Sequence, residues 1–182
     1  MINTSFKKLI KHLQKPIDKE VYLIELDLKI NSNYFINKIE EGIAVSNNNN
    51  YVTHVRGKMT PWDYFANDKN FLSLIKTGVN YLDENINLIS CYLRDAWGTR
   101  IDYNDRVREH DHWGCIISGV LYLQNNGQDL YFKELNISIK PKKGKLLLFS
   151  PMLKHSTKFS LDKKPRYSIA FNYVEDEGKK WK

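Results

Sequence analysis

Alternating apolar and polar residues mark short strands in the first half of the chain, and segments with helical spacing separate them. The segment VYLIELDLKI (21–30) alternates and contains β-branched residues, which predicts a strand. NSNYFINKIEEGIA (31–44) opens with cap residues, and FLSLIKTGVNYL (71–82) has apolar residues at helical intervals, so both are predicted to be helices. Residues 1–85 are therefore expected to form a mixed helix-and-strand region that supports the rest of the fold.

The N-terminal segment MINTSFKKLIKHLQK favours a short amphipathic helix, with Phe6, Leu9, Ile10 and Leu13 on one side. It lacks the continuous apolar core and the cleavage site of a secretory signal. No apolar run approaches the roughly 20 residues that span a bilayer. We therefore expect a cytoplasmic protein without a membrane partner.

From residue 86 onward, strand-like segments follow one another at short intervals, separated by the turn signals QNNG, PKKG, SPM and LDKKP. The segments are INLISCYL (86–93), GCIISGVLYLQ (114–124), DLYFKE (129–134), ISIKP (137–141), GKLLLFS (144–150), HSTKFS (155–160) and RYSIAFNYV (166–174). They predict a mainly β (α+β) fold, a double-stranded β-helix or cupin-like jelly roll over residues 86–175, with the N-terminal helices packed on one sheet. A chain of 182 residues suits one domain, residues 1–182.

Composition narrows the class of protein only a little. Apolar residues make up 42% and aromatic residues 13% of the chain, which excludes a disordered or fibrous protein. The net charge of +7 is scattered, with clusters in KPKKGK (140–145) and KKPR (163–166). These clusters predict either a solvated basic surface or a surface for nucleic acid or another acidic partner. The cysteines Cys91 and Cys115 are expected to be buried, reduced thiols, with a catalytic or bridging cysteine as the alternative.

The segment EHDHWGC (109–115) holds the first candidate for chemistry. In a strand, His110 and His112 project to the same side and can chelate one metal ion, while Asp111 points away. Such a pair alone is more often a surface feature. A third histidine, His155, lies 155 − 112 = 43 residues later at the end of another predicted strand, with four strands between. A jelly roll can bring such distant strand ends together.

A candidate anion site follows in the segment RYSIAFN. Arg166, Ser168, Ala170 and Asn172 share one face of the predicted strand, and the opposite face is apolar. A buried arginine among small polar residues needs an anionic partner, and arginine binds carboxylates through paired hydrogen bonds. A structural salt bridge at the rim of the domain is the alternative.

Five separated elements now stand in a fixed order: H-x-H, SGVLYL, GKLLLF, His155 and Arg166-x-Ser168. Over residues 90–174 this order resembles the iron- and 2-oxoglutarate-dependent oxygenase superfamily, and within it the small oxygenases of bacteria and marine phages, with a prolyl-hydroxylase-like layout. The resemblance implies three iron ligands, His110, His112 and His155. It further implies that 2-oxoglutarate is bound by Arg166, Ser168, Tyr122 and Asn172, with Arg166 on the distal carboxylate.

The second ligand position departs from the usual pattern of two histidines and one carboxylate, because His112 stands where aspartate or glutamate is usual. A bulge could instead turn Asp111 inward. The resemblance implies a dioxygenase with Fe(II) and 2-oxoglutarate as cofactors and dioxygen as co-substrate, which hydroxylates a small molecule, a peptide or a nucleobase. The alternatives are a three-histidine cupin-type metalloenzyme without 2-oxoglutarate and a non-catalytic jelly-roll binding module.

Several secondary expectations remain. RGKMTPWDYF (56–65) is predicted to be a substrate lid or to pack against the barrel. DAWGTRIDYNDR (95–106) is read as a loop that leads to the histidine pair. His12 and His54 look unrelated to the site. An exposed edge of the jelly roll could pair into a homodimer.

Overall fold

The computed structural model describes residues 6–13, 19–46, 53–86 and 88–176. The run NNNN (47–50), which the sequence predicts to be a loop, lies outside the described residues. So does the charged tail EDEGKKWK (175–182), predicted to be frayed, apart from its first two residues. Within the described ranges, no helix is long and apolar enough to cross a membrane.

Seven antiparallel strands form a major sheet in the order β1-β2-β10-β7-β12-β5-β4. Their bounds are β1 (Phe6–Leu13), β2 (Lys19–Asp27), β4 (Lys58–Met59), β5 (Cys91–Ile101), β7 (Ile117–Tyr122), β10 (Lys145–Phe149) and β12 (Arg166–Glu175). A minor sheet has the order β11-β8-β9, with β8 (Leu130–Phe132), β9 (Ile137–Ile139) and β11 (His155–Ser156). A separate pair joins β3 (Val55–Arg56) to β6 (Arg106–Val107).

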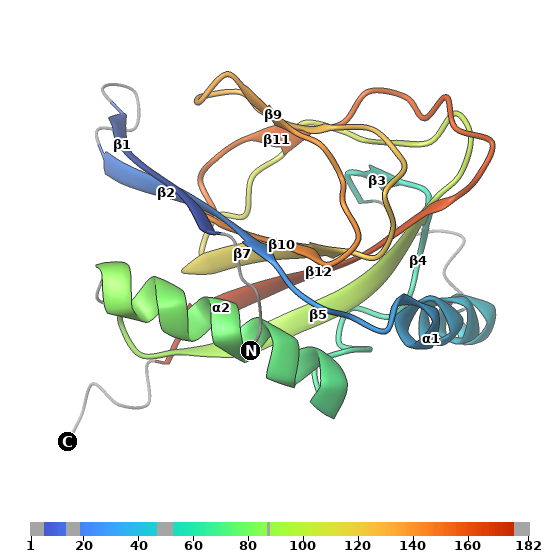
Figure 1. Ribbon diagram of the computed structural model, residues 1–182, viewed down its shortest axis with the longest axis horizontal. Helices are drawn as coiled ribbons and strands as arrows, with labels where there is room; N and C mark the ends of the chain where they lie inside the picture. The colour runs from blue at the N-terminus through green and yellow to red at the C-terminus, as the bar shows by residue number, and fades with distance from the viewer. Residues whose placement is uncertain (1–5, 14–18, 47–52, 87, 177–182) are drawn as a thin grey trace.

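The helices α1 (Ser32–Val45) and α2 (Lys69–Ile86) cover one face of the major sheet, and the minor sheet covers the other (Figure 1). The predicted mainly β jelly-roll fold with helices packed on one sheet is therefore confirmed. Helix α1 begins at the predicted cap residues, whereas α2 begins at Lys69, two residues before the predicted start, after Asp68, which was not predicted as a cap. The Asn31 side chain accepts a hydrogen bond from the Tyr34 backbone N–H, and Asp68 accepts one from that of Phe71.

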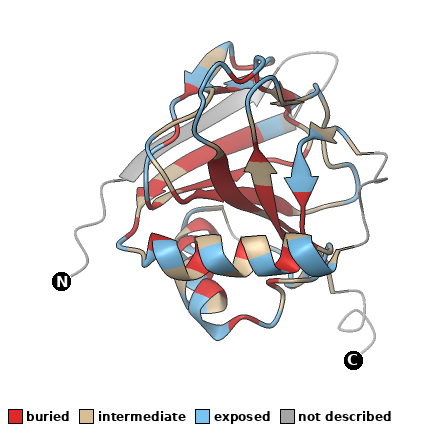
Figure 2. Ribbon diagram, turned by 90° about the vertical axis from the view of Figure 1, so that its right-hand side faces the viewer, coloured by how far each residue is buried: buried red, intermediate tan, exposed pale blue. Residues whose placement is uncertain are grey.

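Strand alternation sorts side chains between two cores, one on each face of the major sheet. In β2, Tyr22 and Ile24 face the helices, while Val21 and Leu23 face the minor sheet. β12 follows the same rule, because Ile169 and Phe171 enter the helix-side core and the intervening residues face the minor sheet. Figure 2 shows the buried residues concentrated in these strands and on the inward sides of the helices. The inter-sheet side of β12 is where the candidate polar residues lie.

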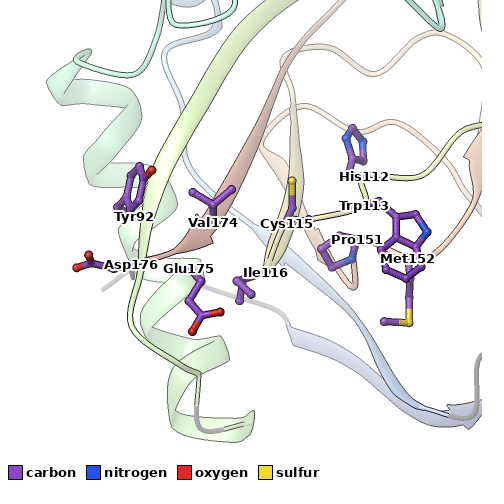
Figure 3. A pocket seen from close by; sticks show the side chains of 11 residues that line it. Tyr92, His112, Trp113, Cys115, Ile116, Pro151, Met152, Val174, Glu175 and Asp176 are labelled. Atoms are coloured by element: carbon purple, nitrogen blue, oxygen red, sulfur yellow. The ribbon is translucent and has the colours of Figure 1, made fainter. Parts of the chain in front are cut away.

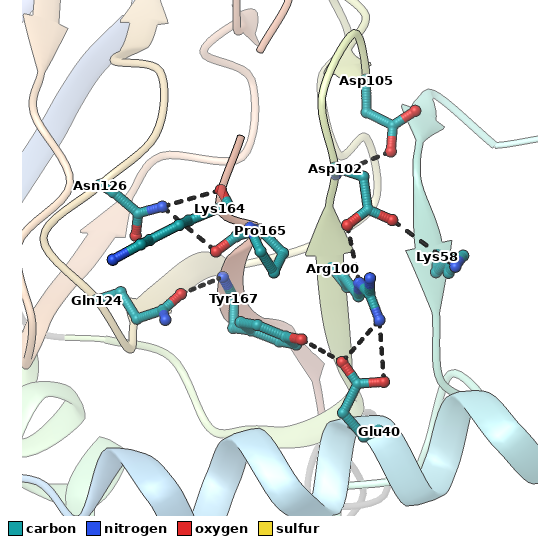
Figure 4. Close-up of polar contacts among 10 residues, drawn as sticks. All are labelled: Glu40, Lys58, Arg100, Asp102, Asp105, Gln124, Asn126, Lys164, Pro165 and Tyr167. Carbon is teal, nitrogen blue, oxygen red and sulfur yellow. Dashed lines mark hydrogen bonds and ion pairs between the residues drawn. The ribbon is translucent and has the colours of Figure 1, made fainter. Parts of the chain in front are cut away.

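Two polar contacts fasten α1 to the strands that carry the site (Figure 4). Arg100 of β5 donates a hydrogen bond to Glu40 of α1 at 3.0 Å. The Tyr167 hydroxyl of β12 donates a short hydrogen bond to the same carboxylate. These contacts hold the end of β12 that begins at Arg166 against the helix layer.

The predicted N-terminal helix is wrong for the described residues 6–13, which form β1. This strand pairs antiparallel with β2 from Phe6↔Leu26 to Leu13↔Lys19. Pairing satisfies the backbone groups along an edge of β2 that a helix could not satisfy. Tertiary pairing therefore overrides the local helical pattern.

The predicted loop at 95–106 is also wrong over most of its length, because β5 continues to Ile101 and pairs with β12. Gly98 in this strand marks a close approach of α1. A Cβ atom there would lie 2.4 Å from Cγ1 of Ile39. The strand also begins later than predicted, at Cys91.

Some residues of the basic clusters are engaged within the fold, and the cysteines are less buried than expected. Lys142 and Lys145 of the KPKKGK cluster form ion pairs at 2.7 Å with Asp27 and Glu25. Arg166 of the second cluster is buried. The two cysteines are free thiols but are only partly buried, so the expectation of full burial is wrong.

Candidate functional site

Three histidines from separate parts of the chain meet at one end of the space between the sheets. His110, His112 and His155 each offer a ring nitrogen within 4.8 Å of those of the other two. The ring centroids lie 4.3 Å apart for His110 and His155 and 5.2 Å apart for His112 and His155. Among the described residues this group contains no carboxylate, and Asp111 is outside it. Three imidazoles at this spacing can hold one transition-metal ion and leave other coordination positions open.

Backbone hydrogen bonds, rather than a regular strand, bring the histidines together. His110 and His155 exchange backbone hydrogen bonds of 3.2 and 2.9 Å in an isolated bridge. The His112 N–H donates to the carbonyl of Pro151 at 2.8 Å. The sequence therefore predicted the convergence of the pair, but the assumed strand does not include His112.

Two of the imidazoles are oriented by carbonyl groups. Nδ1 of His110 lies 2.8 Å from the carbonyl oxygen of Arg108, and Nδ1 of His155 lies 3.0 Å from that of Leu153. A carbonyl oxygen only accepts hydrogen bonds, so each Nδ1 carries the proton in the neutral ring. Nε2 then keeps its lone pair for a metal ion.

Burial keeps these imidazoles neutral. It lowers the pKa of His110, and it lowers the pKa of His155 well below the ordinary value of 6.5. Burial, with added repulsion from His110, lowers the pKa of His112 to about 3. Neutral imidazoles are the form that binds metal, so the cluster is ready for an ion near neutral pH.

Arg166 lies at the other end of the same space, with 4% of its surface exposed. Its Nη1 donates to the carbonyl of Gln128 at 3.3 Å, and its buried Nε has no partner. Burial lowers the pKa of the guanidinium, and among the described residues no carboxylate pairs with it. A buried, incompletely bonded guanidinium is the feature that an incoming carboxylate would complete.

Two hydroxyl groups lie beside this guanidinium. The Tyr122 ring centroid is 5.7 Å from Cζ of Arg166, and burial raises the pKa of the phenol to about 12, so the hydroxyl stays protonated. The Ser168 hydroxyl lies 2.8 Å from that of Thr99 on β5. Thr99 was missed because its segment was read as a loop, although its alternation with Trp97 and Ile101 is a strand signal.

Asn172 lies further along the same face of β12, where its amide has two protein partners. Its Nδ2 donates to Asp95 at 2.7 Å, and its Oδ1 accepts from Ser118 at 2.7 Å. These bonds tie three strands together at the metal end of the sheet. A role for Asn172 toward 2-oxoglutarate stays a prediction.

The loop between β7 and β8 passes directly over Arg166. A Cβ atom on Gly127 would lie 2.4 Å from Cδ of Arg166, so only glycine leaves room for the arginine. The Gly127 N–H donates to Asp162, and the Asn126 amide donates to the carbonyls of Lys164 and Pro165 (Figure 4). The sequence marks QNNG (124–127) as a turn, but nothing in it indicates that this turn contacts Arg166.

A narrow hollow of ≈ 70 Å³ joins the two ends of the site and is called the inner cavity below. Its polar lining includes His110, His112, His155, Tyr122, Thr99, Ser168 and Arg166. Its apolar lining includes Val55, Trp97, Val107, Val120, Leu130, Phe149 and Ala170. The residues present therefore fit a metal ion at one end and a carboxylate at the other. A 2-oxo acid with a second carboxylate suits both ends, because its 2-oxo acid group can bind a metal and its second carboxylate can pair with Arg166.

His54 was set aside as unrelated, but its ring stacks on His110 at 5.0 Å with an interplanar angle of 2°. It comes from the segment before β3, and no sequence spacing could have linked it to the cluster. In the predicted lid segment, Phe65 is fully buried in the helix-side core. Trp62 packs edge-on against Trp97 at 4.6 Å, beside the inner cavity.

Known structures of oxygenases share this fold. The viral collagen prolyl hydroxylase vCPH of Paramecium bursaria Chlorella virus-1, in a 2OG complex, matches with a TM-score of 0.63 and 15% identity, over 92% of this chain and 94% of that chain. A Pseudomonas putida prolyl-4-hydroxylase matches with a TM-score of 0.63 and 13% identity, over 95% and 94%. HygX from Streptomyces hygroscopicus, with nickel, 2-oxoglutarate and hygromycin B bound, matches with a TM-score of 0.60 and 13% identity, over 96% of this chain and 84% of that chain.

At these identities the likeness concerns the fold. The resemblance expected from the sequence is confirmed at that level, because the chain folds like prolyl hydroxylases and other 2-oxoglutarate- and iron-dependent oxygenases. No protein-family model and no curated protein sequence matches the chain.

Proposed function

We propose that this protein is a non-haem Fe(II)- and 2-oxoglutarate-dependent dioxygenase that hydroxylates a C–H bond. The observation that carries the proposal is the pairing, within one inner cavity, of a neutral three-histidine cluster with a buried, incompletely bonded arginine. The fold shared with known oxygenases supports it. Fe(II) and 2-oxoglutarate together supply oxidative decarboxylation, in which dioxygen gives one atom to succinate and one to the substrate, and CO2 is released.

The chain's own residues have separate tasks. His110 and His155 would hold the metal through Nε2, and His112 would supply the third imidazole. The Arg166 guanidinium binds the distal carboxylate of 2-oxoglutarate, and the Ser168 and Tyr122 hydroxyls donate hydrogen bonds to the same end. The apolar side chains of the inner cavity exclude water, which strengthens the charge pair at Arg166.

Three neutral histidines also change the charge of the site. A site with one carboxylate leaves one positive charge on Fe(II), whereas this cluster leaves two. One carboxylate of 2-oxoglutarate would lie at the metal and the other at Arg166. The extra charge on the metal therefore favours binding of the carboxylate next to the 2-oxo group.

The absence of a carboxylate from the described cluster also favours a second candidate, a three-histidine metalloenzyme that does not use 2-oxoglutarate. In that case Arg166 would have no cosubstrate to bind. The two functions differ in whether a 2-oxo acid needs both the metal and Arg166.

An anaerobic titration of the protein with Fe(II) and then 2-oxoglutarate distinguishes the two candidates. Chelation of Fe(II) by a 2-oxo acid gives a weak visible charge-transfer absorption band. We expect the band in the wild type, a much weaker complex in Arg166→Ala, and no change in Arg56→Ala, a control arginine that is exposed. Iron binding without the band would support the second candidate.

A further inference from the structure

The strand pair of β3 and β6 forms one wall of the inner cavity and has an outer face that carries arginines. Val55 and Val107 lie opposite each other in this pair and line the inner cavity. The next opposed residues, Arg56 and Arg106, face the other way because successive side chains of a strand alternate. Like charges that are directly opposite destabilise a strand pair, so an anion bound between these arginines would stabilise it.

A third arginine extends the outer face toward the metal site. Arg108 is exposed, and its N–H donates to the carbonyl of His54 at 2.8 Å, which continues the pairing of β3 with β6. Arg56, Arg106 and Arg108 are called the arginine cluster below. In the part of the chain that the structure describes, no carboxylate lies within ion-pair distance of any of them. The arginine cluster is therefore a site for an anion that is not part of the described chain.

The carboxylates near the arginine cluster do not neutralise it. Glu109 pairs with Lys133 at 3.0 Å. The Asp105 side chain accepts a hydrogen bond from the Asp102 N–H at 2.9 Å, and Asp111 lies among the histidines. With Asp105 and Asp111 both set against the three arginines, the outer face stays positive, as does the whole chain with its net charge of +7. Such a surface attracts a polyanion.

An aromatic ring packs against the arginine cluster. Cζ of Arg106 lies 4.2 Å from the centre of the Phe159 ring, and 47% of the Phe159 surface is exposed. The segment that carries this ring is fixed beside β6, because the Thr157 N–H donates to the carbonyl of Val107 at 3.0 Å. Nucleobases stack on aromatic rings and on guanidinium planes, whereas an acidic side chain has no ring to stack. The pair of Arg106 and Phe159 therefore favours a nucleic acid over an acidic peptide.

A second aromatic residue lies on the other side of the histidine pair. Trp113 follows His112 directly in the chain, and 83% of its surface is exposed. Figure 3 shows Trp113 close to His112 in a second hollow of ≈ 730 Å³, which is within the range of small-molecule sites. Glu175 and Asp176 line the opposite end of this hollow. The end beside His112 therefore suits a base stacked on Trp113, with its phosphates directed away from the acids.

The segment 108–113 connects the arginine cluster to this tryptophan past the metal site. The five residues from Arg108 to Trp113 span at most roughly 18 Å, and His110 and His112 lie between them. A short oligonucleotide that contacts both ends would therefore pass the metal site. Its bases must be unpaired, since an enzyme cannot reach a base that is stacked inside a duplex.

We propose that the arginine cluster binds the phosphodiester backbone of a single-stranded nucleic acid, and that a base of this strand stacks on Trp113 beside the metal site. The strand is the substrate: a C–H bond of that nucleotide becomes C–OH with one atom of dioxygen, while 2-oxoglutarate is oxidised to succinate and CO2. This oxidation rests on the proposed function, whereas binding of the strand does not. RNA and DNA share the chemistry that the site recognises.

Fluorescence anisotropy with the protein loaded with Mn(II) and 2-oxoglutarate tests the inference. The probes are a dye-labelled RNA of about twelve nucleotides and the DNA of the same sequence, and a labelled polyglutamate peptide is the acidic control. We expect saturable binding of at least one oligonucleotide, at least about tenfold tighter than the peptide. The logarithm of Kd should rise with the logarithm of the salt concentration with a slope of about 2, because each phosphate neutralised on a single strand contributes about 0.7. The tighter oligonucleotide identifies the kind of nucleic acid.

A double variant tests the arginine cluster. Arg56→Gln combined with Arg108→Gln should raise the Kd of the oligonucleotide at least about tenfold and lower the salt slope by about 1.4. Lys69→Gln combined with Lys76→Gln, two exposed lysines of α2, removes the same net charge and should leave the Kd and the slope nearly unchanged. The comparison separates contact with phosphates from the general charge of the protein.

Trp113→Ala should raise the Kd at least about fivefold without changing the salt slope, and Trp113→Phe should restore most of the affinity. The inference fails if neither oligonucleotide binds, if the peptide binds as tightly, or if either the arginine double variant or Trp113→Ala keeps the affinity of the wild type. Each variant should keep the iron and 2-oxo acid absorption band, measured without oligonucleotide. Absence of that band from the wild type would instead contradict the proposed function.

Discussion

Two histidines of the cluster, His110 and His155, are held by their surroundings in the form that can bind a metal. The carbonyls of Arg108 and Leu153 fix the rings of His110 and His155 with Nε2 free, and burial keeps both rings neutral. His54 is close to this cluster but is exposed and is not among the three converging ligands. The stacked pair of His54 and His110 therefore permits a direct test of which histidines bind iron.

Loss of a residue that only contacts a metal ligand reduces metal affinity by about 10–100-fold. We expect His155→Ala to reduce the affinity for Fe(II) by more than this range, because a direct ligand is removed. His54→Ala is the matched control and should reduce the affinity for Fe(II) by no more than about 10–100-fold. Anaerobic competition with a metal-binding dye measures both constants. A greater loss in His54→Ala than in His155→Ala would contradict the assignment.

The unfolding free energy of the metal-free protein should fall as the pH drops below about 6.5, the ordinary histidine pKa. Between that pH and about 3, the unfolded chain protonates His112 while burial keeps the folded form neutral. The expected contribution is up to about 1.4 kcal/mol per pH unit for one imidazole. His112→Gln should therefore have a shallower pH dependence in urea unfolding than the wild type, and equal slopes would contradict this account.

The loop between β7 and β8 sets the position of Arg166 at the scale of structural elements. Gly127 packs against the side chain of Arg166, and Asp162 accepts the hydrogen bond that holds Gly127 in place. The carbonyl of Gln128 accepts from the guanidinium itself. Arg166 is thus held by a separate segment as well as by its own strand.

Gly127→Ala should weaken binding of 2-oxoglutarate about tenfold, because a displaced guanidinium loses part of a charge-assisted hydrogen bond. Gly114→Ala is a matched control, since Gly114 also has a positive φ (83° against 106°) but a Cβ atom there meets nothing within 4 Å. The iron and 2-oxo acid absorption band measures both affinities. An equal effect of the two substitutions would show that backbone strain, rather than contact with Arg166, is responsible.

Strand alternation made much of the fold and of the site predictable from the sequence. It placed Arg166 and Ser168 on one face of β12. It also grouped His110 with His112, although hydrogen bonds of the backbone rather than a regular strand bring these two together. It could not predict β1, because that strand forms by pairing with β2 against its own helical pattern. His54 and Gly127 were out of reach for the same reason, since contacts made only in the folded chain bring them to the site.

At the scale of the whole molecule, a bound iron ion and 2-oxoglutarate would together contact both the minor and the major sheet. His155 belongs to β11 of the minor sheet, whereas Arg166 and Ser168 belong to β12 of the major sheet. Ligands that bind only the folded form stabilise it by about 2.7 kcal/mol when present at about 100 times their Kd. Both sheets should therefore unfold at a higher temperature when the site is filled.

We expect 2-oxoglutarate, added to the iron-loaded protein at such an excess, to raise Tm by about 5–10 °C, since about 1 kcal/mol shifts Tm by about 2–4 °C in a domain of this size. Arg166→Ala should keep the shift caused by iron and lose most of the shift caused by 2-oxoglutarate. Anaerobic differential scanning calorimetry gives both values. If 2-oxoglutarate raised the Tm of Arg166→Ala as much as that of the wild type, Arg166 would not be the residue that binds its carboxylate.

This fold and site are proposed to couple dioxygen to the decarboxylation of 2-oxoglutarate. The most direct measurement is mass spectrometry of succinate formed from 2-oxoglutarate by the iron-loaded protein under heavy-isotope dioxygen. We predict succinate that carries one heavy oxygen atom, formed by the wild type and formed far more slowly by Arg166→Ala. Iron-loaded protein that forms no labelled succinate would contradict the account.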